Sequence, residues 1–310
     1  MRIVLSIFCV CLCFTVKAQP ILIDSIITKE SMVRTVNTLA HDSMQGRLTG
    51  TAEAINAAEF IAAEFEKAGL KYITGKNSYF LQYSVFFDFD LKRVWYKGIN
   101  VLGAIKGTVY PDSSIVFCAH YDHIGTKNIG RKSKKDSIYN GANDNASGVA
   151  LLIELAKYYT ATKMNRYTLV FIAFSGEEQG LLGSADAATL FEQSYIKAVL
   201  NFDMVGRPIN SWTKKCMVVA EKPNPIIKEL NAELNSGEDF FIQDMFPLEY
   251  MFKRSDHYSF TEVKKRVFFT ATAPTDRFYH TLGDEVGTID FDFLLTVTKN
   301  IAHCCKVFLQ

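Results

Sequence analysis

Seven side chains that can bind a metal ion or move a proton lie where predicted strands or loops end. They are His120, Asp122, Asp144, Glu177, Glu178, Asp203 and His280. Imidazole and carboxylate together suit zinc or a similar first-row divalent ion, and no cysteine accompanies them to indicate a closed structural site. A set of this size, with about five ligands and a further carboxylate left free, exceeds what one catalytic ion needs. They match two ions that hold a water between them.

The adjacent carboxylates Glu177 and Glu178 follow the most distinctive stretch of the chain. Residues 168–174 are rich in Val, Ile and Phe, which is typical of a strand buried on both faces of a mostly parallel sheet. Ligands bind at the C-terminal ends of such strands. Burying two adjacent carboxylates is costly unless a cation or a proton compensates them. On its own, the pair of glutamates would indicate a charged turn at the end of a strand. The other candidate ligands at strand and loop ends favour a metal site instead.

Strands alternate with helices along the whole chain. Strands are expected over residues 80–87, 99–105, 114–119, 168–174, 196–202, 217–220 and 267–272, and helices over 29–41, 51–68, 148–158, 181–191, 225–235 and from about 291. In the helix over 51–68, the residues Ile55, Ala58, Ala62 and Phe65 fall on one apolar stripe. No repeat or low-complexity linker divides the sequence, so the order predicts one α/β domain with a mixed, largely parallel sheet.

Residues 1–18 predict a secretory signal peptide. Arg2 supplies the positive end, residues 3–16 the apolar core, and Ala18 the cleavage site before Gln19. Residues 19–310 then form a single secreted or periplasmic domain with no stable membrane insertion after cleavage. An uncleaved anchor is the alternative. Residues 207–255 are expected to be an insertion that shapes the substrate pocket.

The bulk composition excludes several classes of protein. The net charge of +1 does not favour a nucleic acid partner. Four cysteines remain beyond the signal peptide, at positions 118, 216, 304 and 305, and they lack the pattern of a disulfide-rich scaffold. We therefore expect the domain to be stabilised by its core and by metal.

Six motifs in chain order resemble those of the secreted co-catalytic di-zinc aminopeptidases, the bacterial leucyl aminopeptidase-like exopeptidases. The motifs are HYDH, GANDNASG, FSGEEQGLLGS, NFDMVG, RSDHYSF and FYHT, and the resemblance covers residues 46–290. It implies a three-layer α/β/α sandwich. It also implies hydrolysis of N-terminal residues from peptides by a hydroxide held between two zinc ions.

The same resemblance implies roles for individual residues. His120 and Asp203 would hold one zinc ion, Glu178 and His280 the other, and Asp144 would bridge both. The peptide bond after this bridging aspartate is often cis in the family.

Three further positions take roles around the ions. Glu177 would be the general base and Tyr279 would stabilise the oxyanion. Asp122 would accept the second N–H of His120 and fix its tautomer. His123 is not expected to be a ligand, since the family pattern uses the first histidine and the aspartate of HYDH.

Two alternative functions stay open. A glutaminyl cyclase uses the same scaffold with a single zinc ion, and an inactive binding module would need no ion. The chain also departs from the family after His280, where a Thr-Pro and polar-Asp-Thr turn is replaced by TLGDEV. This change leaves the geometry of the rim open.

Overall fold

The computed structural model describes residues 23–73, 76–89, 92–127, 136–191, 196–209, 212, 214–220, 225–243, 251–261, 267–271 and 276–309. The predicted signal peptide lies outside these ranges. No helix within them combines the length and the apolar character that a membrane span requires.

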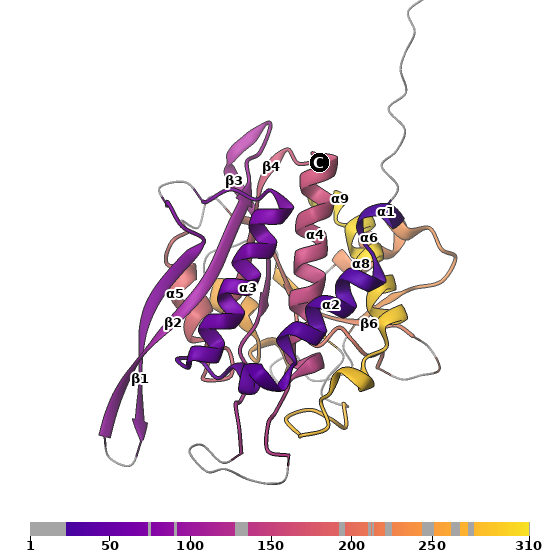
Figure 1. Ribbon diagram of the computed structural model, residues 1–310. Coiled ribbons are helices and arrows are strands. Elements are labelled where there is room, and N and C mark those ends of the chain that lie inside the picture. Colours follow the sequence, from indigo (N-terminus) through magenta and orange to yellow (C-terminus); the bar gives the residue numbers. More distant parts are fainter. Residues whose placement is uncertain are drawn as a thin grey trace, which may run out of the picture.

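A mixed sheet forms the middle of the described structure (Figure 1). Its strand order is β1-β2-β4-β3-β5-β8-β6-β7. The strands are β1 Phe80–Phe89, β2 Lys92–Ile105, β3 Tyr110–His120, β4 Tyr167–Phe174, β5 Ile196–Phe202, β6 Cys216–Ala220, β7 Phe241–Gln243 and β8 Val267–Ala271. The central strands β4, β3, β5 and β8 pair in parallel, as do β6 and β7. Antiparallel pairs join β1 to β2, β2 to β4 and β6 to β8. The expected mixed sheet with parallel strands is confirmed.

Helices cover both faces of the sheet, so the structure has the three expected layers (Figure 1). They are α1 Ile23–Ile26, α2 Lys29–Leu39, α3 Ala52–Ala68, α4 Gly148–Thr162, α5 Leu182–Ala188, α6 Ile226–Leu234, α8 Phe291–Cys304 and α9 Lys306–Leu309, with the short turns η1 Asp42–Arg47, η2 Ala142–Ser147, η3 Asp256–Phe260 and η4 Val286–Thr288. The main core lies between the sheet and α2, α3, α4 and α8. A second core lies under α5 and η3.

Helix α3 has the expected ends, and its buried face departs from the expected stripe at one position. The Thr51 hydroxyl accepts the amide of Ala54, and Gly69 ends the helix with a φ of 86°. Ile55 is 40% exposed, so its placement on the buried stripe was wrong. The alanines make several faces of this helix similarly apolar. The rest of the stripe, Ala58, Ala62 and Phe65, is buried as expected, together with Ile61.

The parallel register brings the ends of the central strands to one edge. His120 at the end of β3 pairs with Phe174 at the end of β4, and Cys118 pairs with Asn201 near the end of β5. The residues that directly follow these strands therefore lie together. This is the edge where the sequence placed most of its candidate ligands.

Replacing Phe171 should strongly destabilise the domain. Its fully buried ring stacks on Phe117 with the ring centroids 5.3 Å apart, and the surroundings can fill the space only in part. We expect Phe171→Ala to lower the free energy of unfolding by about 3–5 kcal/mol in urea titrations. The same change at Phe80, which is 37% exposed, should cost only about 0.5 kcal/mol. Equal losses at the two positions would contradict this account of the core.

Candidate metal centre

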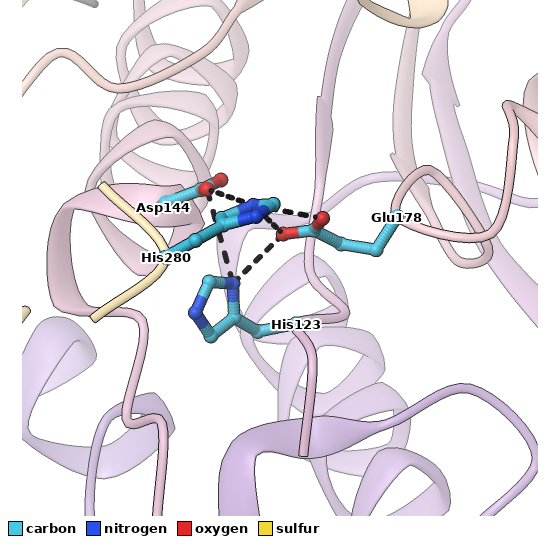
Figure 2. Close-up of side chains that lie close together, drawn as sticks. All are labelled: His123, Asp144, Glu178 and His280. Carbon is cyan, nitrogen blue, oxygen red and sulfur yellow. Dashed lines mark hydrogen bonds and ion pairs between the residues drawn. The ribbon is translucent and has the colours of Figure 1, made fainter. Parts of the chain in front are cut away.

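Two groups of donor atoms meet at the carboxyl edge of the sheet. One comprises His120, Asp144 and Asp203, and the other His123, Asp144, Glu178 and His280 (Figure 2). Within each group the donor atoms all lie within 4.8 Å of one another. Asp144 belongs to both groups. The structure thus brings together all five residues that the resemblance implied as ligands.

The spacing of the donor atoms suits zinc. His120 Nε2 lies 3.3 Å from Asp144 Oδ1 and 3.5 Å from Asp203 Oδ1. His280 Nε2 lies 3.2 Å from Asp144 Oδ2 and 3.0 Å from Glu178 Oε2. Zinc bonds of ~2.0–2.2 Å in a tetrahedron separate neighbouring ligand atoms by ~3.3 Å. In addition, Asp203 Oδ1 is buried and has no hydrogen-bond partner among the described residues. The residues present therefore fit two zinc ions.

His123 lies inside the second group, where the sequence analysis did not place it. Its ring is fully buried, and Nδ1 is 2.8 Å from Glu178 Oε1 and 3.9 Å from Asp144 Oδ2. Its position in the HYDH motif was the available signal. The family resemblance does not use this signal, because it assigns a zinc-binding role only to the first histidine of the motif, His120.

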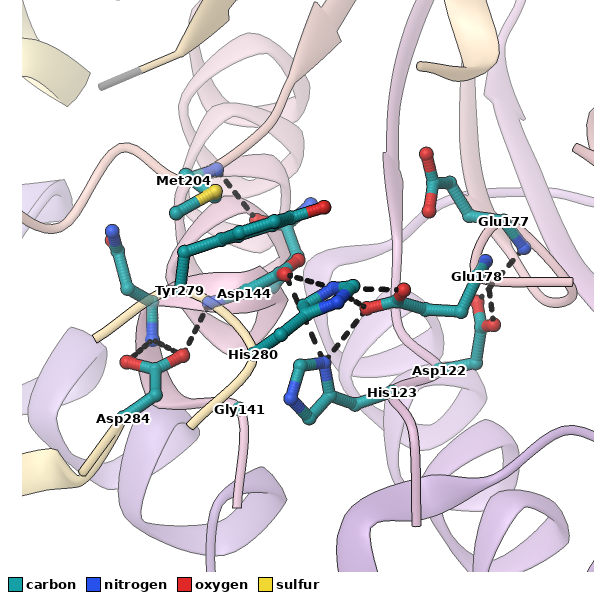
Figure 3. Close-up of polar contacts among 12 residues, drawn as sticks. Asp122, His123, Gly141, Asp144, Glu177, Glu178, Met204, Tyr279, His280 and Asp284 are labelled. Carbon is teal, nitrogen blue, oxygen red and sulfur yellow. Dashed lines mark hydrogen bonds and ion pairs between the residues drawn. The ribbon is translucent and has the colours of Figure 1, made fainter. Parts of the chain in front are cut away.

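Asp122 supports the site differently from what was expected. His120 Nδ1 donates to the main-chain carbonyl of Asp122 at 3.2 Å, while the carboxylate is 3.8 Å away. Because a carbonyl only accepts, Nδ1 carries a proton, and Nε2, which faces Asp144 and Asp203, is the nitrogen that would bind an ion. The Asp122 carboxylate instead accepts the amides of Glu177 and Glu178 at 3.3 Å each (Figure 3). One residue thus orients both the histidine and the glutamate pair.

The loop that carries Asp144 is held by Asp284, a residue that the sequence analysis did not single out. The buried Asp284 carboxylate accepts the amides of Asn143 and Asp144 at 2.9–3.1 Å, and Arg207 donates to it at 3.0 Å (Figure 3). The bond between Asp144 and Asn145 is cis, as the resemblance implied. Asp284 belongs to the altered turn after His280, so this turn keeps a carboxylate that supports the site.

Ser255 is a second residue that the sequence did not reveal. Its hydroxyl donates to Asp203 Oδ2 at 2.7 Å and accepts from Asn201 Nδ2 at 2.6 Å. These buried bonds fix one oxygen of Asp203 and leave the other directed at His120.

The carboxylates of the site differ in their affinity for protons. Burial raises the pKa of Glu177 well above its ordinary value, and the nearby His120 opposes this without cancelling it. For Asp144, burial acts in the same direction. Hydrogen bonds from His120 and His280 outweigh it and hold the pKa of Asp144 well below the usual range. Burial therefore favours the protonated form of Glu177, whereas the two histidines favour the ionised form of Asp144.

Tyr279 is placed beside the second group. Its ring stacks on that of His280 with centroids 3.9 Å apart (Figure 3), and Arg254 donates to its hydroxyl at 3.3 Å. Burial raises the pKa of Tyr279 above its ordinary value, so the hydroxyl keeps its proton and can donate it in a hydrogen bond.

A buried guanidinium ties the supporting loops together. Arg47 donates to the main-chain carbonyls of Leu39, Tyr121, Asn140 and Gly141 at 2.5–2.9 Å. Tyr121 directly follows His120, and Gly141 precedes the turn that carries Asp144. Both halves of the site are therefore fixed to one side chain.

The sequence is similar to those of known metallopeptidases. The chain is 29% identical to a probable zinc metalloprotease of Pyricularia oryzae over 64% of its length, and 28% identical to aminopeptidase Y of Saccharomyces cerevisiae over 77%. It spans 47% and 45% of the length of these two relatives.

Solved structures share the fold at lower identity. A zinc aminopeptidase from Bacillus subtilis has a TM-score of 0.69 at 17% identity, covering 92% of this chain and 96% of that one. A glutaminyl cyclase from Fimbriiglobus ruber has a TM-score of 0.70 at 15% identity, covering 91% and 95%. Residues 100–305, which include every candidate ligand, match the sequence profile of peptidase family M28, and the chain belongs to that family.

Proposed function

We propose that this protein is a zinc-dependent aminopeptidase that removes N-terminal residues from peptides with a free amino terminus. The observation that carries this proposal is two donor groups sharing Asp144, with a half-buried carboxylate, Glu177, that belongs to neither. A carboxylate that binds no ion is free to move protons. The relatives' names, zinc metalloprotease and aminopeptidase Y, support the same activity.

The residues would divide the work as follows. His120 and Asp203 would hold one zinc ion, Glu178 and His280 the other, and Asp144 both. Zinc lowers the pKa of a bound water from ~15.7 towards ~7.

Side chains of the protein would carry out the proton transfers. Glu177 takes the proton of the attacking water and passes it to the leaving amine, and its raised pKa suits holding that proton between the two steps. The Tyr279 hydroxyl donates to the carbonyl oxygen as negative charge develops there. The acidic residues around the ions attract the substrate's free α-ammonium group, which makes the enzyme an exopeptidase.

Two features outside the chemistry belong to the same proposal. Residues 1–18 would direct export as a signal peptide. Residues 207–255 supply β6, α6 and β7 at one edge of the sheet, and as an insertion they would shape the pocket for the substrate side chain.

Glutaminyl cyclisation is the second candidate, since the cyclase of Fimbriiglobus ruber shares the fold. A cyclase needs one Lewis acid, because the substrate's own α-amine attacks its side-chain amide. A peptidase must supply a nucleophile, and a pair of ions does this well. The ligands that a second ion requires, His120 and Asp203, favour the peptidase.

Removing the metal should abolish hydrolysis and destabilise the fold. Without cations, the buried carboxylates repel one another and must take up protons. Zinc at ~1,000 times its Kd would stabilise the native state by about 4 kcal/mol, so chelation should lower the Tm, and added zinc should restore it. Activity would be followed with an aminoacyl-nitroanilide. Full activity in a verified metal-free preparation would contradict the proposal that zinc is required for hydrolysis.

The adjacent glutamates should respond differently to the same substitution. Glu177→Gln keeps size and polarity but removes the base, so kcat should fall by ~10²–10⁴ with zinc content near that of the wild type. Glu178→Gln should instead lose zinc, because a ligand carboxylate is gone. The measurements are steady-state kinetics and metal analysis on both variants, each serving as the other's control. The opposite pattern would mean that the two roles are reversed.

Substrate and metal stoichiometry together separate the two candidate activities. We expect about two zinc ions per chain at saturation, hydrolysis of peptides with a free N-terminus, and no hydrolysis of their N-acetylated counterparts. Mass spectrometry of glutaminyl peptides should show no pyroglutamate. One ion that stays single in excess zinc, together with cyclisation of N-terminal Gln, would instead establish the cyclase.

A further inference from the structure

We propose that His123 is a fourth protein ligand of the ion bound by Asp144, Glu178 and His280. One ion position then has four protein donors, while the position formed by His120, Asp144 and Asp203 has three. This inference rests on the proposed zinc chemistry, but it concerns which side chains hold the ions and not which bond is cleaved.

The geometry points to His123 because its ring faces the same two carboxylates as that of His280. His123 Nδ1 lies 2.8 Å from Glu178 Oε1 and 3.9 Å from Asp144 Oδ2 (Figure 2). These distances bracket the ~3.3 Å that separates neighbouring ligand atoms on tetrahedral zinc. The two rings meet edge to face, at 74° with centroids 5.5 Å apart, so that their nitrogens converge.

The surroundings of His123 fit a ligand better than a packing residue. The ring is fully buried, and its Nε2 has no hydrogen-bond partner within the described ranges, so its polar contacts there are all made by Nδ1 at the ion position. Gly141 leaves the space that the ring needs, since a Cβ atom there would come within 2.6 Å of His123 Cγ.

The two ion positions therefore differ in kind. Two imidazoles and two carboxylates, of which Asp144 is shared with the other position, would supply the four donors of a tetrahedral site. Closed sites of this type retain their metal, whereas catalytic sites keep a position open for water or substrate. The three-donor position at His120 would then be the one with room for a water or a substrate oxygen beside the protein ligands.

Cobalt substitution tests the ligand count without measuring activity. Metal-free full-length protein is titrated with Co²⁺, and proton NMR spectra are recorded in H₂O and D₂O. Each coordinated imidazole then shows one strongly shifted, exchangeable ring N–H signal. We expect three such signals at saturation, from His120, His123 and His280. Two signals in the wild-type protein would overturn the proposal, and this outcome needs no variant to fold.

A variant identifies the third signal. His123→Asn should lose one of the three N–H signals and weaken zinc binding at one position by more than ~100-fold. Removing a residue that only hydrogen-bonds to a ligand typically weakens metal binding by ~10–100-fold, so a larger loss indicates a ligand. His303→Asn, at an exposed histidine of α8, is the matched control and should keep all three. Three signals remaining in His123→Asn would overturn the assignment. If the wild-type protein hydrolyses peptides but shows two N–H signals, the assignment of His123 as a ligand is rejected and the proposed function stands. If it shows three N–H signals but hydrolyses no peptide, the proposed function is rejected and the assignment of His123 stands.

Discussion

The site depends on a positive charge that the protein carries permanently. Arg47 is fully buried, and its four hydrogen bonds run to main-chain carbonyls of three separate segments. Burying a guanidinium costs several kcal/mol unless hydrogen bonds and nearby anions compensate it. Burial lowers the pKa of Arg47 to about 10, against the opposing field of Asp122 and Asp144 among others. The loops around the ions are thus fixed by hydrogen bonds to a cation of the chain itself, and their positions do not depend on metal alone.

The sheet and the position of the site could be predicted because both are local features of the sequence. Strands β4 and β5 are continuous apolar runs, which is typical of buried parallel strands, and their predicted ends agree with the structure. Glu177 and Asp203 follow those ends within a few residues. Parallel pairing then fixes which edge they share, and no knowledge of side-chain contacts is required for this step.

What the sequence did not reveal depends on contacts between distant segments. Asp284 accepts the amide of Asp144 across 140 residues, and Ser255 donates to Asp203 across 52. Neither residue has a local pattern that distinguishes it from a polar surface residue. The position of His123 inside the second donor group also depends on the fold, and the exposure of Ile55 was not predicted because an alanine-rich helix offers several apolar faces. Each of these positions is decided by tertiary packing.

The long separation between the ligands also sets when the enzyme can become active. Glu178 and His280 lie 102 residues apart, and His280 precedes only the last helices of the described chain. A chain still being synthesised has the first donor residues but not His280, so it cannot assemble the second donor group. Closing such long loops is slow and happens only once the central strands have paired. Both donor groups are therefore complete only after most of the chain has been made and the central strands have paired.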